Sequence, residues 1–343
     1  MRSRFKYLLF GLRSRLDKRK AEKAQERKKA AAIDAAIEHL VDGIDPTMRA
    51  VIGYKKKLWQ AVDEVLIYID KLVANIPGPV ECNRKSFATD PLVNAIFATA
   101  GDIQKTFSQS EAVRAFFDEP MNVNVDECYA LMCMEKEERT GFGVEMEGGV
   151  VKKDVPQVSV NFSAHSILSP AATESEVRSC LKQCMFDALI SNTFESVMAN
   201  HMRKAGTDEY RKVLDRRYKA NQAWGQELTD LILSIRADAR TSNATAASVP
   251  TIQDENGAQN SQLETPEDRL TRVMEILVQP ENMIRLTHIS MNLTRLGIKV
   301  KEGSSQAFNT IEFTEIAINA VWHRIIVLVR YPRNEMLLKD GLF

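Results

Sequence analysis

The side chains that most often carry chemistry, cysteine and histidine, are few in this 343-residue sequence. Cys128 and Cys133 lie in a strand-like stretch, while Cys180 and Cys184 are one helical turn apart. Four thiolates could bind zinc or an iron–sulfur cluster, but this spacing lacks the paired C-x2-C pattern of most such sites. Cys180 and Cys184 also fall within or beside the apolar stripe of a predicted helix, where cysteine behaves as a small hydrophobic residue. The sequence therefore favours packing, and we expect no metal and no cofactor.

The five histidines form no His-Glu-x-x-His or His-x-His pattern. Ser163, His165 and Ser166 follow a predicted strand, a place where active-site loops occur, but no paired acid is evident. Gly141 and Gly143 match the first two glycines of the dinucleotide-binding pattern G-x-G-x-x-G, but the third position is Met146. No Walker lysine pattern occurs in the sequence. We predict no catalytic residue. An enzyme whose site assembles from distant residues stays an alternative.

The segment Arg330-Tyr331-Pro332-Arg333 combines basic and aromatic side chains at the end of a predicted strand. These side chains could stack on a phosphate-bearing ligand and pair with it. More often, such residues close a strand edge and pack an arginine stem over an aromatic ring. The packing role is our expectation, and ligand binding is the alternative.

Charge distribution gives the strongest indication of a partner, although the net charge is zero. Residues 1–30 carry 12 basic and three acidic residues, so the rest of the chain has a net charge of −9. A basic arm on an acidic body predicts an anionic partner for the arm, or contact between the arm and the body. The predicted anionic-surface residues are Arg2, Arg4, Lys6, Arg13, Arg15, Lys18, Arg19 and Lys20, and the predicted membrane-contact residues are Phe5, Leu8, Leu9 and Phe10.

Three roles of this arm stay open. Its apolar residues recur at three- and four-residue steps, which is typical of a basic amphipathic helix on an anionic membrane face. Its Lys and Arg side chains could instead contact nucleic-acid phosphates. Its lack of acids before Asp17 also resembles a mitochondrial transit peptide, and a flexible tail without a specific role is the simplest alternative.

Helix signals dominate the first 120 residues. Aspartate followed by proline at residues 45–46 and 90–91 combines an N-cap with proline in the first helical turn. Ser110 is a further start signal, and the Pro-Gly-Pro at residues 77–79 ends a helix. We therefore predict a basic amphipathic arm over residues 1–30 and a helical region over residues 31–120.

Extended segments begin after residue 120. Tyr129–Met134 and Val158–Phe162 have the composition of strands, and four glycines lie between them. Three or four antiparallel strands with short turns fit this stretch. It forms the first part of a predicted region over residues 121–241.

Long helices complete that region. Thr173 and Glu176 form a capping-box pattern before a helix that reaches Lys204. A second helix is predicted over Asp208–Arg240; it would be ~50 Å long at ~1.5 Å per residue and could protrude as half of a helical hairpin.

Residues 242–264 contain no Lys or Arg and almost no large apolar residues, which predicts a disordered linker. Residues 265–343 form the last predicted region, a helix pair plus strands that can complete the same core. Thr265 caps its first helix, and a second helix is predicted from Pro280 to Leu296. Strands are predicted over Ile311–Phe313 and over Val321–Tyr331, the latter as a central strand.

The fold class expected from these elements is α+β, mostly helical, with small antiparallel sheets and long amphipathic helices. An odd, low number of cysteines favours reduced thiols, and no apolar run approaches the ~20 residues that span a bilayer. A secretory signal is not expected, because Arg and Lys follow the apolar patch Tyr7–Leu12. We predict a non-enzymatic interaction or scaffold protein with a protein partner, cytoplasmic and peripheral to the inner membrane. A nucleic-acid-associated protein is the alternative.

Overall fold

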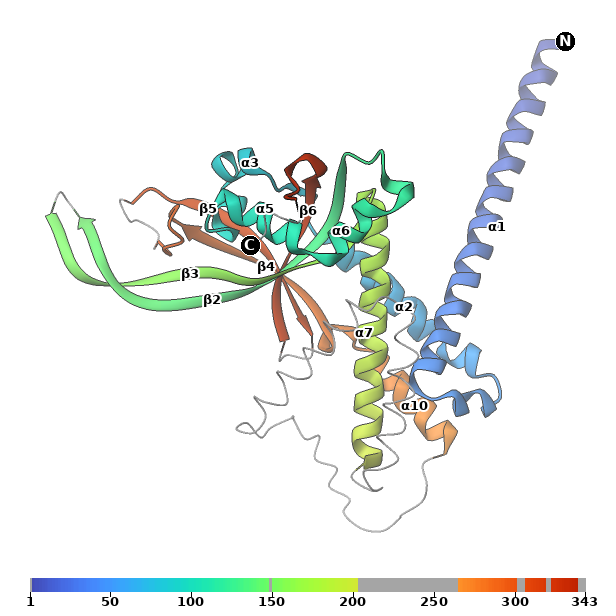
Figure 1. Ribbon diagram of the computed structural model, residues 1–343. Coiled ribbons are helices and arrows are strands. Elements are labelled where there is room, and N and C mark those ends of the chain that lie inside the picture. Colours follow the sequence, from blue (N-terminus) through green and yellow to red (C-terminus); the bar gives the residue numbers. More distant parts are fainter. Residues whose placement is uncertain (1, 148–149, 203–264, 301–305, 319–321, 339–343) are drawn as a thin grey trace. The chain divides into compact units, whose positions relative to one another are not determined.

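The computed structural model describes residues 2–147, 150–202, 265–300, 306–318 and 322–338 (Figure 1). For residues 2–21, 145–147, 150–151, 198–202 and 322 it describes the backbone alone. The fold is α+β and mostly helical, as the sequence predicts. The chain divides into two compact units, and in the described part of the chain the boundaries fall within α2 (Tyr54–Asn75), α7 (Glu174–Met202) and the 3-10 helix η3 (Pro280–Asn282). The helix predicted over Asp208–Arg240 and the linker predicted over residues 242–264 lie outside the described residues.

The described residues of unit 1 are 2–68, 190–202 and 265–280. Its described elements are α1 (Arg2–Ile44), the 3-10 helix η1 (Pro46–Ala50), parts of α2 and α7, and α10 (Pro266–Leu277). Apolar side chains at three- and four-residue steps put one face of each helix into the core. The buried residues include Ile33, Ile37, Leu40, Val41, Leu58, Val62, Val65, Phe194, Val197, Leu270, Val273 and Leu277.

Asp45 joins η1 to α10 within unit 1. As predicted, it is an N-cap, and its carboxylate accepts a hydrogen bond from the Thr47 amide at 2.9 Å. The same carboxylate forms an ion pair with Arg269 of α10. Burial alone would raise the pKa of Asp45, but the bonds from Arg269 and Thr47 outweigh it and hold the pKa below its usual value.

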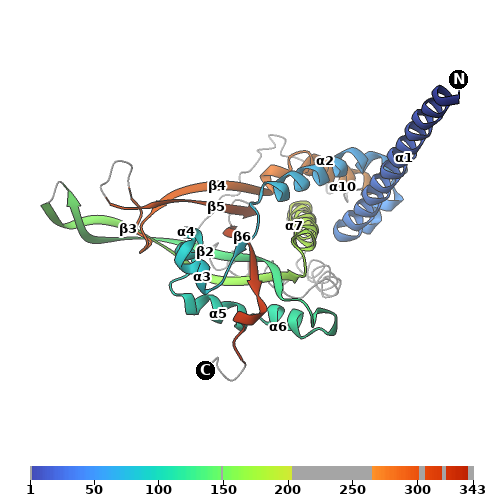
Figure 2. The ribbon, with the colours of Figure 1, turned by 90° about the horizontal axis from the view of Figure 1, so that it is seen from above.

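Unit 2 contains the sheet, in the strand order β3-β2-β6-β5-β4 (Figure 2). Its long strands pair antiparallel, and the short β1 (Val80–Glu81) runs parallel to β6. Both β-containing parts of the chain contribute to this single sheet. The strand predicted at the centre is confirmed as β6. The bounds are β2 (Glu127–Glu147), β3 (Val150–Ala171), β4 (Ile284–Leu293), β5 (Asn309–Ile318) and β6 (Trp322–Pro332).

Two predictions about this sheet were wrong. The three or four strands expected after residue 120 are one hairpin, in which β2 and β3 pair from Tyr129 with Ala171 to Glu147 with Val150. The charged residues 135–139 continue β2, because β3 supplies a pairing partner for them. The helix expected up to Leu296 is strand β4, whose ten residues all pair with β5. The spacing of its apolar residues fits both the period of a helix and that of a strand, and pairing with β5 decides for the strand.

Short helices pack against this sheet: α3 (Arg84–Thr89), α4 (Pro91–Ile96), α5 (Ala100–Gln109) and α6 (Glu111–Asp118). Their predicted starts are confirmed at two points, because Asp90 caps α4 and Ser110 caps α6. Helix α7 begins at the predicted capping box, where the Glu176 amide lies 3.3 Å from the Thr173 hydroxyl. The core of unit 2 unites these helices with the sheet through residues such as Ile96, Ile103, Phe107, Val113, Met132, Phe313, Ile325 and Tyr331.

Candidate functional site

The predicted anion-binding and membrane-contact residues all lie in the N-terminal half of α1. The backbone is helical without a break from Arg2 to Ile44, so the arm and the following Lys- and Glu-rich stretch form one helix (Figure 1). The stretch before Ile33, which is the first buried residue among the described side chains, is about 46 Å long at about 1.5 Å per residue. The side chains of residues 2–21 lie outside the described part, so their roles stay predictions.

The described side chains of α1 show how the arm continues toward unit 1. Residues 22–29 are all exposed, because polar residues surround the helix on every side. Lys23, Arg27 and Lys28 lie in this stretch, and Lys29 forms an ion pair with Asp63 of α2 at 2.8 Å. A basic, solvated helix therefore leads from the core of unit 1 toward the predicted site residues.

The aromatic and basic cluster at the end of β6 has the packing role predicted for it. Tyr331 is fully buried and stacks on Phe107 with ring centroids 4.1 Å apart. Arg333 donates hydrogen bonds to the carbonyls of Phe117 and Val123 and lies over the Phe117 ring at 4.9 Å. Arg330 pairs with Glu81 at 3.1 Å and also with Glu127 at 3.6 Å. The guanidinium groups are therefore bound within unit 2.

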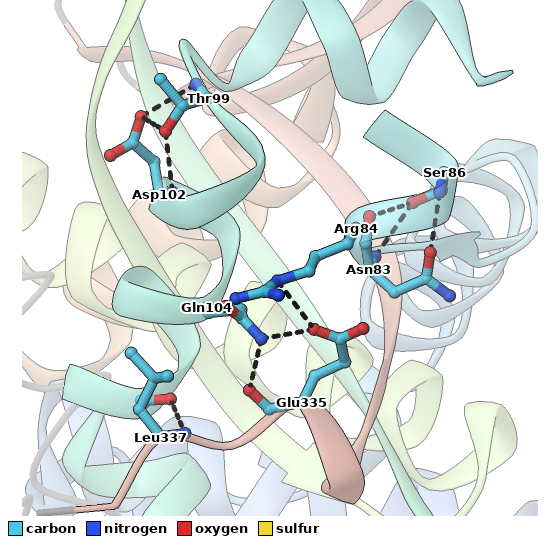
Figure 3. Close-up of polar contacts among 9 residues, drawn as sticks. Asn83, Arg84, Ser86, Thr99, Asp102, Gln104, Glu335 and Leu337 are labelled. Atoms are coloured by element: carbon cyan, nitrogen blue, oxygen red, sulfur yellow. Dashed lines mark hydrogen bonds and ion pairs between the residues drawn. The ribbon is translucent and has the colours of Figure 1, made fainter. Parts of the chain in front are cut away.

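A polar network that the sequence did not indicate lies beside this cluster (Figure 3). The Gln104 amide oxygen accepts a hydrogen bond from Arg84 at 2.9 Å, and its nitrogen donates to the Glu335 carboxylate at 2.6 Å. Nearby, the Leu337 amide donates to the Ser108 hydroxyl at 2.8 Å. The bonds from Gln104 to Glu335 and from Leu337 to Ser108 join residues more than 200 positions apart, so no local pattern signals the network. It attaches the segment after β6 to α3 and α5.

His165 lies within β3, so the prediction that it follows a strand was wrong. Its Nε2 donates to the Ile96 carbonyl across 2.8 Å, and its ring stacks on Phe97 with centroids 5.0 Å apart. Burial lowers the pKa of His165, which favours the neutral ring. The neighbouring Ser163 is also part of the β2–β3 ladder, opposite Glu135. This arrangement is that of a packed histidine in a sheet.

The five cysteines fall into two groups. Cys82, Cys128 and Cys133 are buried, and desolvation raises their thiol pKa values, for Cys128 and Cys133 to about 12. Cys180 and Cys184 are only half-buried, and their sulfur atoms lie 3.9 Å apart. The packing interpretation of this pair was therefore incomplete. Among the described residues, no group of three or more His, Cys, Asp or Glu side chains could hold a metal ion.

The distal part of the β2–β3 hairpin exposes apolar side chains. Phe142 is 78% exposed and Val144 is 57% exposed. Figures 1 and 2 show this part of the hairpin extending beyond the other strands of the sheet. A β-bridge links Ser159 of β3 to Ile298. Between this bridge and the hairpin turn, β2 pairs only with β3 among the described residues. The alternation of glycine, apolar and acidic residues over 141–147 was the sequence signal for this surface.

Two further observations bear on function. No helix among the described residues has the length and apolar character needed to cross a bilayer. Comparison with protein-family models, with curated proteins and with solved structures finds no match for this chain.

Proposed function

We propose that this protein is a non-catalytic interaction protein that binds an anionic membrane surface through the N-terminal half of α1. The observation that carries the proposal is the unbroken helix from Arg2 to Ile44. A helix is the conformation in which residues at three- and four-residue steps share one face. In this helix, such steps connect Phe5, Leu8, Leu12 and Leu16, as well as Leu9.

The energetics of adsorption support this proposal. A basic residue near an anionic membrane surface contributes about 1 kcal/mol, and each buried methylene contributes about 0.8 kcal/mol. Eight basic residues and several leucines over the first 20 positions therefore exceed the two signals that stable attachment needs. The exposed, polar stretch over residues 22–29 then separates the membrane-binding segment from the core of unit 1.

Nucleic-acid binding is the second candidate, and one observation favours it. Lys23, Arg27 and Lys28 lie beyond the apolar residues of the arm and are exposed. They would contribute to phosphate binding without contributing to an apolar membrane contact. The two candidates therefore predict different sets of essential residues.

The distal part of the β2–β3 hairpin is the surface that we assign to a protein partner. Phe142 and Val144 have large exposed fractions, and exposed apolar groups of this kind often mark interaction sites. Replacing Phe142 with serine should weaken capture of a protein partner and leave attachment to membranes unchanged.

Vesicle flotation of the full chain and of a form lacking residues 2–20 tests the membrane proposal. We expect the full chain to float with phosphatidylserine-containing vesicles, to stay at the bottom with phosphatidylcholine vesicles, and to lose flotation on deletion. Equal flotation of both forms would contradict the proposal. Salt-dependent binding of RNA or duplex DNA that needs Lys23, Arg27 and Lys28, without flotation, would support the nucleic-acid candidate instead.

A further inference from the structure

Cys180 and Cys184 form a close pair of thiols on one face of α7. Their sulfur atoms are 3.9 Å apart, and the Ser169 hydroxyl of β3 lies 3.1 Å from the Cys180 sulfur. Both cysteines are half-buried, whereas the other three cysteines are buried. Small solutes can therefore reach this pair in the folded protein.

The surroundings of the pair favour one thiolate. The hydrogen bond from Cys184 has the largest effect on the pKa of Cys180 and lowers it. Burial raises this pKa and the Ser169 hydroxyl lowers it further, so that the pKa of Cys180 is about 6. The same hydrogen bond between the thiols, together with burial, raises the pKa of Cys184. The carboxylate of Asp187 disfavours both thiolates. At neutral pH, the pair thus holds one proton, on Cys184.

We propose that Cys180 and Cys184 are a peroxide-reactive dithiol, in which Cys180 is the attacking thiolate and Cys184 the resolving thiol. The Cys180 sulfur attacks one oxygen of hydrogen peroxide, the O–O bond breaks, and a sulfenic acid forms as hydroxide leaves. The Cys184 sulfur then attacks the sulfenic sulfur, the S–S bond forms, and the departing hydroxide takes the Cys184 proton to become water. The first hydroxide takes up the proton that Cys180 released to solvent on ionisation, so two thiols lose two electrons and one peroxide becomes two waters.

The position of the pair in a helix determines what this oxidation does to the structure. Residues four apart in a helix have Cβ atoms about 5–6 Å apart, whereas a disulfide needs about 3.5–4.5 Å. The turn of α7 between Cys180 and Cys184 must therefore open when the disulfide forms. A strained disulfide of this kind is readily reduced, so the change is reversible by thiols. Oxidation of the dithiol would loosen the N-terminal part of α7.

Peptide mapping of the peroxide-treated full chain tests the proposal. We expect a disulfide between Cys180 and Cys184, with Cys82, Cys128 and Cys133 still reduced. In Cys184→Ala, dimedone should trap a sulfenic acid on Cys180, and Cys180→Ser should remove both products. Cys133→Ala is the matched control and should leave the disulfide unchanged. A reduced Cys180–Cys184 pair after peroxide, or a disulfide between two chains, would overturn the proposal.

The rate at which iodoacetamide alkylates Cys180 at pH 7 tests the role of Cys184 without oxidation. If Cys184→Ala returns the pKa of Cys180 to the ordinary 9.0, the thiolate fraction falls about 90-fold, while the remaining thiolate is about 16- to 32-fold more nucleophilic. The net alkylation rate should fall about three- to six-fold. An unchanged rate would refute the role of Cys184. Should a variant fail to fold, as judged by circular dichroism, the peptide map of the unaltered chain decides alone.

Discussion

Replacing Arg333 with alanine should destabilise unit 2, because this side chain binds the end of α6. Its guanidinium donates to the carbonyls of Phe117, Asn122 and Val123, and it lies over the Phe117 ring. The last carbonyls of a helix have no partner within the helix, so a cation that binds them satisfies them and also complements the helix dipole. The three carbonyls together make Arg333 a C-terminal cap for α6 and for the turn that follows.

The size of the effect follows from these contacts. At about 1 kcal/mol for each of three hydrogen bonds and about 0.5–1 kcal/mol for the cation–π contact, Arg333→Ala should lower the free energy of unfolding by about 3–4 kcal/mol. Arg333→Lys keeps the charge but lacks the planar fork, so we expect a loss of about 1–2 kcal/mol. Arg139 is a matched control, since it is largely exposed and pairs only with Glu137 among the recorded ion pairs. Its replacement with alanine should cost less than about 1 kcal/mol.

Urea unfolding gives the free energies, and hydrogen exchange of the α6 amides localises the change. Faster exchange over Glu111–Asp118 in Arg333→Ala, with little change in Arg139→Ala, is the expected result. If Arg333→Ala unfolds at the same urea concentration as the unaltered chain, the packing role is refuted. The ligand-binding alternative for this cluster would then regain support.

Three further substitutions test other parts of the fold. Asp45→Ala should cost about 2–4 kcal/mol in urea unfolding, because it removes a cap and leaves Arg269 without its recorded partner. The pKa of Asp45 is held below 3.8 in the fold, so this difference should be fully present above pH 4 and should shrink as pH falls below that value; a pH-independent difference would contradict the ion pair. Tyr331→Phe should be neutral or stabilising by up to about 1 kcal/mol in thermal unfolding, because the hydroxyl is desolvated and its interaction with the Ser108 hydroxyl offsets only part of that cost. A clear loss of stability would contradict this. Gly297→Ala should lower the free energy of unfolding by about 1–3 kcal/mol, because φ of Gly297 is +72° and a Cβ would lie 2.8 Å from the Val160 carbonyl oxygen. Hydrogen exchange of the Val160 amide should also accelerate, and an unchanged exchange rate would count against this contact.

Local sequence signals predicted the starts of helices well. Asp90, Ser110, Thr173 and Thr265 all cap the helices that they were expected to start. Asp45 is also an N-cap, but of the short 3-10 helix η1, whereas the long helix expected after it begins only at Tyr54. A cap depends on side chains and amides within three residues of one another, so a short window of sequence contains all of its determinants.

Pairing over long distances could not be predicted in the same way. The apolar residues of β4, such as Ile284 and Ile289, fit a helix or a strand, and only β5 decides between them. The approach of Ser169 to Cys180 likewise depends on how β3 leads into α7, and no spacing within α7 reveals it. The sequence therefore located the thiol pair but not the Ser169 hydroxyl that lies beside it.

The residues of the basic arm present the opposite situation. Their charge and spacing are evident from the sequence, and the helical backbone of α1 agrees with the period on which the prediction rests. Which surface they bind depends on a partner, and neither spacing nor backbone geometry specifies it. Binding measurements are therefore the decisive evidence.

The most direct test of membrane attachment compares two substitutions of equal charge in the full chain. Leu12 is at a four-residue step from Leu8 and Leu16, so Leu12→Asp removes an apolar side chain from the shared face. Tyr7 is at neither a three- nor a four-residue step from these leucines, so Tyr7→Asp changes a position off that face. Equilibrium binding to phosphatidylserine-containing vesicles should weaken at least ten-fold for Leu12→Asp, from a loss of about 1.5–3 kcal/mol of apolar burial, and clearly less for Tyr7→Asp. Equal weakening of both, or no weakening of either, would contradict a membrane-bound amphipathic helix.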